Sequence, residues 1–262
     1  MRTALTIAGS DSGAGAGIQA DLKTFAAHGV YGTSAITAVT AQNTRGVAGW
    51  EPVSPGLVVS QIEAVVSDIG ADAAKTGMLA NAAIVEAVAG TLGRLAIPAV
   101  VVDPVMIAKG GDRLLEKAAV AAIRKHLLPL ATVVTPNVPE AEELAGMRIT
   151  SLDDMGQAAR RILELGPRVV LVKGGHLDGE QSIDIAADAG GMFEFRGPRL
   201  PTLHTHGTGC TLASAIAANL ALGYEVRDAI GRARIYLEGA IRNAPGIGHG
   251  HGPLSHFWRG VY

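Results

Sequence analysis

The only cysteine in the chain, Cys210, stands where a glycine-rich turn meets an apolar segment that is typical of a buried helix. Gly207 and Gly209 allow the backbone to turn tightly and to expose N–H groups at a helix start, where the helix dipole adds positive potential. Together with Thr208, this turn suits a phosphate or a transition state rich in negative charge, and the same potential would stabilise a Cys210 thiolate. The alternative interpretation is a tight turn that carries a small buried cysteine.

A second glycine-rich segment, Gly9–Asp21, follows an apolar run near the start of the chain. It loosely matches the fingerprint of dinucleotide-binding proteins, but that fingerprint requires an acidic residue at the end of the next strand. This chain has Gln42 and Asn43 there, which argues against a nicotinamide or flavin site. The sequence also lacks the Gly-x-x-x-x-Gly-Lys-Ser/Thr pattern of P-loop enzymes. A loop of small residues beside Asp21 and Gln42 is better suited to closing over a compact polar ligand.

Three oxygen-bearing side chains follow two of the apolar runs: Asp103 in "VVVDPVM", and Asn137 and Glu140 in "TPNVPEAEEL". Two carboxylates and an amide oxygen could hold waters around Mg²⁺, which commonly binds through one or two carboxylates plus substrate phosphate. The alternative is that Asn137 and Glu140 merely cap a helix that begins near Pro139. Spacing alone does not separate the two interpretations.

Lys173 ends another apolar run and precedes two glycines, in "LVKGGH". An exposed surface lysine is the ordinary interpretation, but in this position the side chain could point into a phosphate site. The tail "GHGHGPLSHFW" carries His249, His251 and His256 without supporting cysteines or nearby acids. This composition favours a glycine-rich tail that packs against the domain over a metal site.

These residues follow short runs that are apolar at successive positions, as in strands covered by helices on both faces, which predicts a mainly parallel sheet. Such a sheet gathers ligand-binding groups at the carboxyl ends of its strands. The predicted strands are Ala4–Ser10, Thr33–Gln42, Ala99–Val105, Ala131–Asn137 and Arg168–Gly175.

Longer segments with helical periodicity separate these strands, and a strand pair around Gly190–Gly191 is expected to be antiparallel at one sheet edge. The pattern predicts one α/β domain over residues 1–262, with a mainly parallel central sheet, helices on both faces and a small antiparallel edge. The predicted helices are Gly17–His28, Pro55–Ile69, Asn81–Leu95, Leu114–Leu127, Ser151–Leu165 and one following Gly207.

Composition argues against two classes of binding partner, nucleic acid and membrane. The formal net charge of −2 and an aromatic content of 4% provide neither the positive charge nor the stacking surfaces that nucleic-acid binding uses. A single cysteine cannot form an internal disulfide, which fits a reducing compartment. No stretch approaches the roughly 18 uninterrupted apolar residues of a membrane span. We therefore expect a cytoplasmic protein that binds neither nucleic acid nor membrane.

Taken together, the motifs resemble the ribokinase-like superfamily, and within it the hydroxymethylpyrimidine/phosphomethylpyrimidine kinase family of thiamine biosynthesis. They occur in order from Ala8 to Trp258, and the ordered set is far more specific than any single motif. The cysteine of Gly-Thr-Gly-Cys separates this branch, with some pyridoxal kinases, from sugar kinases that carry Asp there. The matching stretches are "AGSDSGAGAGIQADLKTF", "TAVTAQNT", "KTGML", "DPVMIAKGGDRLL", "TPNVPEAEEL", "VLVKGGH", "HGTGCTLASAIA" and "GHGPLSHFW".

This resemblance implies a three-layer ribokinase-like fold and an enzyme that depends on ATP and Mg²⁺. Such an enzyme phosphorylates 4-amino-5-hydroxymethyl-2-methylpyrimidine (HMP) and then phosphorylates HMP phosphate to the diphosphate. It also implies a homodimer. By motif, Gln42 would bind the edge of the pyrimidine ring through its amide. The residues expected to line the same pocket are Gly9, Asp21, Met78 and Val105.

At the phosphate end, the resemblance implies that Asp103 and Glu140 bind the metal and that Asn137, Lys173 and Thr208 contact the nucleotide phosphates. The residues from Gly207 to Cys210 would form an anion hole for the transferring phosphoryl group. Cys210 would accept the proton of the substrate hydroxyl, provided that the helix start lowers its pKa.

One departure and two rival functions remain open. The family often reads Thr-Lys-Asn-Thr-His before the Gly-Thr-Gly-Cys motif, where this chain has "TLHTH" with Leu203 and His204. Pyridoxal kinase activity is possible on the same scaffold, although Gln42 and Met78 favour the pyrimidine. A non-catalytic sensor that binds pyrimidine is the other rival. It would not need both the acidic residues and the Gly-Thr-Gly-Cys turn.

Overall fold

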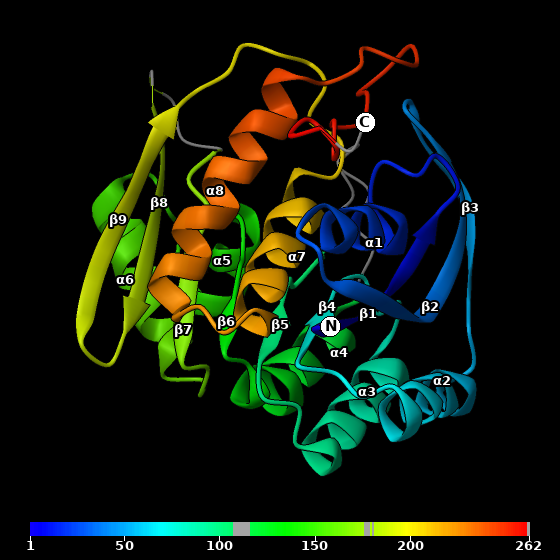
Figure 1. Cartoon of the computed structure of the whole chain (residues 1–262). Helices are drawn as coiled ribbons and strands as arrows, with labels where there is room; N and C mark the ends of the chain where they lie inside the picture. The colour runs from blue at the N-terminus through cyan, green and yellow to red at the C-terminus, as the bar shows by residue number, and fades with distance from the viewer. Residues whose placement is uncertain (107–115, 176–178, 180, 261–262) are drawn as a thin grey trace.

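The computed structural model describes residues 1–106, 116–175, 179 and 181–260. Its centre is a single sheet in the order β3-β2-β1-β4-β5-β6-β7-β8-β9 (Figure 1). The strands are β1 (Thr3–Asp11), β2 (Tyr31–Asn43), β3 (Gly46–Pro52), β4 (Ala73–Thr76), β5 (Val100–Val102), β6 (Val133–Val134), β7 (Val169–Val172), β8 (Gln181–Asp188) and β9 (Gly191–Pro198).

The middle of the sheet, from β2 through β7 in that order, is parallel. β8 and β9 pair antiparallel at one edge around the predicted turn, and β3 pairs antiparallel with β2 at the other. The prediction of a mainly parallel sheet with an antiparallel edge is therefore confirmed. The sequence analysis missed the second antiparallel edge, because β3 is exposed along most of its length and shows little apolar pattern.

Helices cover both faces of the sheet, as predicted (Figure 1). α1, α7 and α8 pack on one face, and α2 to α6 pack on the other. The helices are α1 (Gly17–Ala27), α2 (Pro55–Asp68), α3 (Ala82–Leu95), α4 (Lys117–Ala122), α5 (Val138–Ala145), α6 (Leu152–Leu163), α7 (Thr208–Ala221) and α8 (Val226–Arg242), with a π-helical turn η1 (Ile123–Leu127) and a 3₁₀ turn η2 (Leu128–Leu130).

Several helix starts are fixed by the side chains that their sequences offer. Ser54, Asn81 and Ser151 each accept a hydrogen bond from a backbone N–H in the first turn of α2, α3 and α6, which satisfies a group that the helix leaves unpaired. The predicted helix Leu114–Leu127 is split into α4 and η1, and its first residues lie outside the described part of the chain. α8, which the sequence analysis did not single out, crosses the face that α7 covers.

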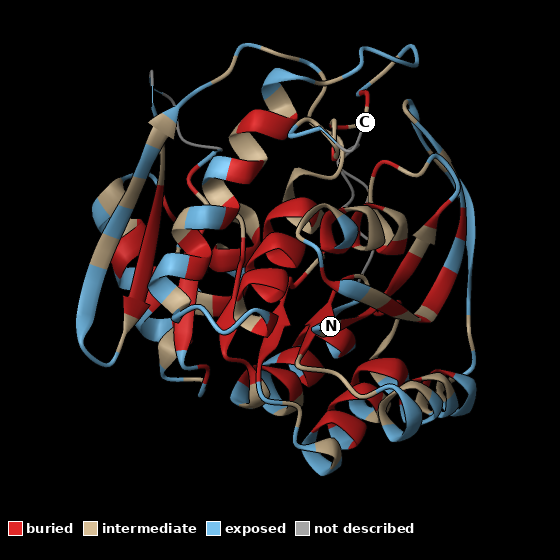
Figure 2. Ribbon diagram, viewed as in Figure 1, coloured by how far each residue is buried: buried red, intermediate tan, exposed pale blue. Residues whose placement is uncertain are grey.

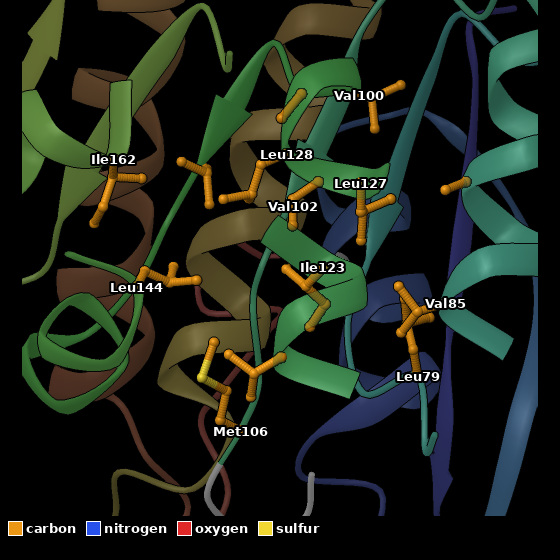
Figure 3. Packing of buried hydrophobic residues seen from close by; sticks show 14 of the residues in the cluster. Leu79, Val85, Val100, Val102, Met106, Ile123, Leu127, Leu128, Leu144 and Ile162 are labelled. Carbon is orange, nitrogen blue, oxygen red and sulfur yellow. The ribbon is translucent and has the colours of Figure 1, made fainter. Parts of the chain in front are cut away.

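The two hydrophobic cores alternate along the strands. Val101 packs with α7 and α8, whereas its neighbours Val100 and Val102 pack on the opposite face. Figure 3 shows Val102 beside Ile123 and Leu127 of η1, in the same cluster as Val100. In Figure 2 the buried residues concentrate in the central strands and in the helix faces turned toward them. This alternation holds the carboxyl ends of the parallel strands rigidly at one rim of the sheet.

Candidate active site

A cavity of about 830 Å³ opens at the carboxyl ends of the parallel strands. Gln42 at the end of β2 and Cys210 in the first turn of α7 both line it, so the two glycine-rich segments converge as expected. The predicted site residues among its lining are Gly9, Gln42, Met78, Asp103, Val105, Asn137, Glu140, Lys173, Gly207, Thr208, Gly209 and Cys210.

The start of α7 is an open anion-binding end. Gly207 caps the helix with a φ of +83°, a conformation that favours glycine, and it offers no side chain to cover the first-turn N–H groups. A Cβ at this position would also collide with the carbonyl oxygen of Gly15. The turn is therefore built from two glycine-rich loops in contact. The Thr208 N–H reaches the carbonyl of Thr205 at 3.4 Å, and the N–H groups of Gly209 and Cys210, with the helix dipole, favour a phosphoryl group.

Cys210 is half-buried in the cavity wall, where the N–H of Gly17 hydrogen-bonds its sulfur. Burial raises the pKa of the Cys210 thiol to about 11, and the carboxylates of Asp21 and Asp103 act in the same direction. The Lys75 ammonium opposes them only in part. The expectation that the helix start lowers this pKa is therefore wrong for the protein without ligands. The thiol is protonated at neutral pH.

Asp21 does not line the cavity but lies beneath it, fully buried. Its carboxylate oxygens lie 3.0 and 2.9 Å from Nζ of Lys75, and it also accepts hydrogen bonds from the hydroxyls of Thr6 and Ser214. Burial alone would lower the pKa of Lys75, but the charges of Asp21, Cys210 and Asp103 and the hydrogen bond to Asp21 together outweigh it and raise the pKa. The expectation that Asp21 lines the acceptor pocket is corrected, because Asp21 instead ties α1 to β1, β4 and α7 under the site.

Asp103, Lys173 and Glu140 form a charged cluster against the α7 turn. Nζ of Lys173 lies 3.0 Å from Oδ1 of Asp103, and a Cβ at Gly209 would lie 3.4 Å from Nζ of Lys173 and 3.5 Å from Oδ2 of Asp103. Burial raises the pKa of Glu140 to about 7, the Lys173 charge opposes this, and the Asp103 charge adds to it. The Lys173 ammonium thus offsets the charge of two buried carboxylates, those of Asp103 and Glu140.

Asn137 and Glu140 form a capping box at the start of α5. The Asn137 N–H donates to Oε2 of Glu140 at 2.8 Å, and the Glu140 N–H donates to Oδ1 of Asn137 at 2.9 Å. The helix-cap interpretation is thus what the structure shows, and the same two side chains also face the cavity. The cap fixes Glu140 in place instead of competing with a role in the site.

The acidic pair fits a divalent cation held jointly with phosphates. Burial, with a smaller contribution from the Asp103 charge, raises the pKa of Glu140, and a cation between the two carboxylates would offset both effects. In the described ranges no group of three or more His, Cys, Asp or Glu side chains could hold a metal alone. Mg²⁺ suits this donor set, because it commonly takes one or two carboxylates and completes its shell with phosphate and water.

Gly9, Met78 and Val105 add apolar surface to the lining of the cavity. A Cβ at Gly9 would lie 3.5 Å from Sδ of Met78, so a side chain there would enter the space in front of the thioether. The hydroxyl of Thr37 donates to the Met78 carbonyl at 2.6 Å and holds this residue in place. A polarisable thioether at this position is suited to packing against a flat ring.

The sequence analysis missed the pair of Asp11 and His206, which joins the two glycine-rich loops. The Asp11 carboxylate accepts hydrogen bonds from the N–H groups of Gly13, Gly15 and Ala16 at 2.8 to 3.0 Å, and from Nε2 of His206 at 2.9 Å. Burial acts to raise the pKa of Asp11, but these hydrogen bonds outweigh it and lower the pKa. Only their positions in the sequence could have indicated this pair, because Asp11 ends β1 and His206 directly precedes Gly207.

Beyond the charged cluster, the cavity extends between β8, β9 and α8. Arg234 of α8 lies 3.1 Å from Oδ2 of Asp184, and its guanidinium lies over the ring of Phe195. Burial raises the pKa of Asp184, although Arg234 opposes this. Phe195 and Ile241 belong to the lining of this end. The cavity therefore has a small polar end near Gln42 and a longer, partly apolar end, on either side of the α7 turn.

The histidine-rich tail packs on the domain, as its composition indicates. His256 is buried with Nε2 3.1 Å from the hydroxyl of Thr211, and its carbonyl accepts a hydrogen bond from Tyr236. His251 contacts the carbonyl of Leu203, whose side chain is exposed. The parts of the sequence motifs from 107 to 115 and at His176 lie outside the described residues.

The description "Phosphomethylpyrimidine kinase" belongs to a family model that matches residues 11–255. A hydroxymethylpyrimidine/phosphomethylpyrimidine kinase of Synechococcus elongatus is 53% identical over 97% of this chain and 97% of its own length. The thiamine biosynthesis bifunctional protein ThiED of Geobacter sulfurreducens is 53% identical over 96% of the chain, which spans only 51% of that protein. A Bacillus subtilis pyridoxal kinase in complex with ADP superposes with a TM-score of 0.93 at 39% identity, covering 100% of both chains.

Proposed function

The chain belongs to the phosphomethylpyrimidine kinase family, and from that premise we propose that it uses ATP to phosphorylate HMP and then HMP phosphate. The product of the second step is HMP diphosphate, a precursor of thiamine diphosphate. The observation that carries this proposal is that Gln42 and Met78 share one cavity with the open start of α7. An acceptor held at Gln42 and Met78 presents its hydroxymethyl group toward the start of α7.

The acceptor end is suited to a small flat heteroaromatic ring. Gly9 has no side chain and faces the Met78 thioether, so a flat ring can pack on the thioether, and Gln42 provides a polar group in the same lining. Val105 closes the apolar wall. Asp21 acts here through Lys75 and α7 and does not touch the ring.

Transfer of the phosphoryl group relies mainly on positioning and charge stabilisation. The hydroxyl oxygen of the acceptor attacks the γ-phosphorus while the bond to the β,γ-bridging oxygen breaks. The N–H groups from Gly207 to Cys210 face the negative charge on the transferring group, with Thr208 among them. Lys173, next to Gly209 and Asp103, adds a positive charge on the other side.

Cys210 is positioned to take the hydroxyl proton in the first reaction, but only in its thiolate form. Because burial raises the pKa of this thiol to about 11, few molecules carry the thiolate at neutral pH. The backbone N–H groups and Lys173 therefore contribute more to the rate than the base does. In the second reaction the acceptor is a phosphate that is largely ionised at neutral pH, and a base has little to remove.

ATP and Mg²⁺ are the co-substrate and metal that this site accommodates best. Asp103 and Glu140 would hold the metal jointly with the phosphates, and the capping box with Asn137 keeps Glu140 in register. When bound, the metal neutralises phosphate charge. The longer end of the cavity, beside Phe195 and Arg234, has the apolar walls that a nucleotide base requires. Dependence on ATP agrees with the expected cytoplasmic location.

Pyridoxal kinase activity is the second candidate, because a pyridoxal kinase superposes with a TM-score of 0.93. Pyridoxal is also a flat heteroaromatic ring with a hydroxymethyl group. Sequence identity favours the pyrimidine, at 53% with the Synechococcus elongatus enzyme against 39% with the pyridoxal kinase. We therefore treat pyridoxal as a side substrate.

We also propose a homodimer that forms through the β3 edge of the sheet. β3 is the terminal strand on that side, and Val39 and Trp50 nearby are 54% and 38% exposed. An edge strand beside apolar side chains is a surface that a second copy could cover. The mass in solution, measured by light scattering, tests this proposal, and a monomer at micromolar concentration would overturn it. No helix in the described part of the chain has the length and apolar character needed to span a bilayer.

The test of the main proposal is ADP release with each acceptor offered separately: HMP, HMP phosphate, pyridoxal and ribose. We expect turnover with the first two, weaker turnover with pyridoxal and none with ribose. Turnover with pyridoxal alone would transfer the assignment to the second candidate. Absence of turnover with all four, in protein that binds ATP, would refute the kinase assignment.

A further inference from the structure

Gln42, at the end of β2, lies at the end of a hydrogen-bonded series that the mechanism above does not use. Its amide nitrogen lies 3.3 Å from Nε2 of His206, and Nε2 of His206 lies 2.9 Å from Oδ2 of Asp11. Its amide oxygen lies 3.3 Å from the hydroxyl of Thr40, which in turn lies 2.9 Å from the carbonyl of Ser10. All of these residues line the cavity.

The protons of this series can be counted, starting from Asp11. Its side chain is 3% exposed and accepts three backbone N–H groups, an arrangement that keeps it ionised. An ionised oxygen 2.9 Å from Nε2 of His206 requires the proton to be on that nitrogen. The Nε2 atom then has no lone pair left to accept a hydrogen bond from the amide of Gln42.

The other side of Gln42 leads to the same conclusion. A hydroxyl has one proton, and the proton of Thr40 is best used on the carbonyl of Ser10 at 2.9 Å. The Gln42 oxygen 3.3 Å away then faces an oxygen with no proton to give. A half-turn of the amide about its last bond corrects both contacts, because the oxygen then faces the Nε2 proton, which it shares with Asp11 in a three-centre hydrogen bond, and the nitrogen donates to Thr40.

We propose that His206, anchored by Asp11, is a positioning residue that holds the Gln42 amide with its oxygen toward the imidazole. In this orientation one N–H of Gln42 binds Thr40, and the other remains for the ligand. Gln42 therefore donates to an acceptor atom of the ring, which in HMP is a ring nitrogen. The inference rests on the proposed function for the identity of the ring. It adds the residue that sets the polarity of ring recognition.

The location of His206 explains how it can hold this orientation. Its backbone N–H donates to the carbonyl of Gly252 at 3.2 Å, and its ring fills the space that a side chain at Gly15 would occupy. The imidazole is 12% exposed. The residue is thus fixed by the C-terminal segment, by the first glycine-rich loop and by Asp11, and it has little freedom to turn away from Gln42.

The test compares His206→Leu, His206→Gln and the control His249→Leu. Gln places an amide N–H near the position of Nε2, whereas Leu removes the donor. His249 lies in the same group of loops, but its side chain is exposed, and its backbone N–H donates to the hydroxyl of Thr44. Each variant is assayed for KM and kcat with HMP and with the two analogues in which one ring nitrogen is replaced by CH.

In the unchanged protein and in His249→Leu, we expect one of the two analogues to show a KM at least about tenfold above that of HMP, as loss of one good hydrogen bond predicts. In His206→Leu this ratio should collapse toward one while KM for ATP stays unchanged, and His206→Gln should restore most of it. Adding His206→Leu to Gln42→Leu should have no further effect on the ratio.

Two results would overturn the inference. One is a His206→Leu enzyme whose ratio between HMP and the analogues is unchanged. The other is an equal loss with all three acceptors that His206→Gln does not restore, which would indicate loop support only. Absence of turnover with HMP in the unchanged protein would instead refute the proposed function, so the two failures are distinguishable.

Discussion

The acceptor end and the phosphate end of the cavity are stabilised in opposite ways. Around Asp11 a single negative charge receives three backbone N–H groups and an imidazole N–H, and its pKa is lowered. Around Asp103 and Glu140 two carboxylates share the ammonium of Lys173, and burial raises the pKa of Glu140 to about 7. The first arrangement is complete without a ligand, whereas the second is short of positive charge until a metal ion binds together with the nucleotide. Recognition of the ring is therefore preorganised, and charge stabilisation is shared with the co-substrate.

The strongest test of this contrast is Lys173→Met. Removing the ammonium leaves two buried carboxylates next to the transferring phosphoryl group, so kcat should fall about 10³-fold in both phosphorylations, as loss of a central charge-stabilising group does. KM for HMP should change by less than about threefold, because the acceptor end does not depend on this charge.

The control for this experiment is Lys117→Met, an exposed lysine in α4. It should retain full activity. Steady-state kinetics at saturating ATP measure both variants. A Lys173→Met enzyme that loses acceptor binding as severely as turnover would show that the two ends are not independent.

The next effect in size is expected from Gly207→Ala. A Cβ there collides with the carbonyl of Gly15 and occupies a φ of +83°, so the start of α7 must shift away from the transferring group. We expect kcat to fall about 10²-fold, comparable to the loss of one oxyanion donor.

Gly223→Ala is the matched control, because it has a φ of +90° at the other end of α7 and no atom within 4 Å of an added Cβ. Both variants should lose about 1 kcal/mol of stability from the unfavourable backbone conformation, and Gly207→Ala should lose more because its Cβ also collides with Gly15. Only Gly207→Ala should lose activity. Thermal unfolding and kcat measured in parallel separate the two effects, and equal loss of activity would refute the role of the turn.

These tests also show which features a sequence can and cannot provide. β1, the parallel sheet and the helix after Gly207 were predictable, because local apolar runs and glycines determine them. His206 was not, because its partners Gln42 and Asp11 are 164 and 195 residues away in the chain. β4 was missed for a similar reason. Its buried Lys75 reads as polar until the fold brings Asp21, 54 residues away, beside it.

The pKa of Cys210 shows the same limit. A cysteine at a helix start predicts a lowered pKa from local sequence, yet the structure raises it to about 11, because burial and distant carboxylates outweigh the local field. The position of the thiol was thus predictable, but its proton affinity was not. That affinity depends on the three-dimensional arrangement of Asp21, Lys75 and Asp103.

Proton transfer to Cys210 gives a smaller effect that is confined to one reaction. Because the thiol pKa lies near 11, the thiolate fraction rises about tenfold per pH unit between pH 7 and 9. The rate of HMP phosphorylation should rise with it, up to that slope, while phosphorylation of HMP phosphate stays flat. Cys210→Ala should lower the first reaction about tenfold at pH 8 and abolish its slope. Equal losses in both reactions would refute the role of Cys210 as the base.

The smallest effect concerns His256, in the C-terminal segment that packs against Thr211 of α7. Burial lowers the pKa of His256 from 6.5 to about 4, so the unfolded chain takes up this proton before the folded protein does. Stability should therefore be intact above pH 6.5 and fall as the pH drops toward 4, by at most about 3 kcal/mol from this group. His256→Gln keeps a hydrogen-bonding group beside Thr211 but does not titrate, so chemical denaturation between pH 7 and 4.5 should show a shallower fall than in the unchanged protein. Since packing and not charge holds this side of α7, kcat at pH 8 should be the same in both proteins, and a large loss there would place His256 in the site itself.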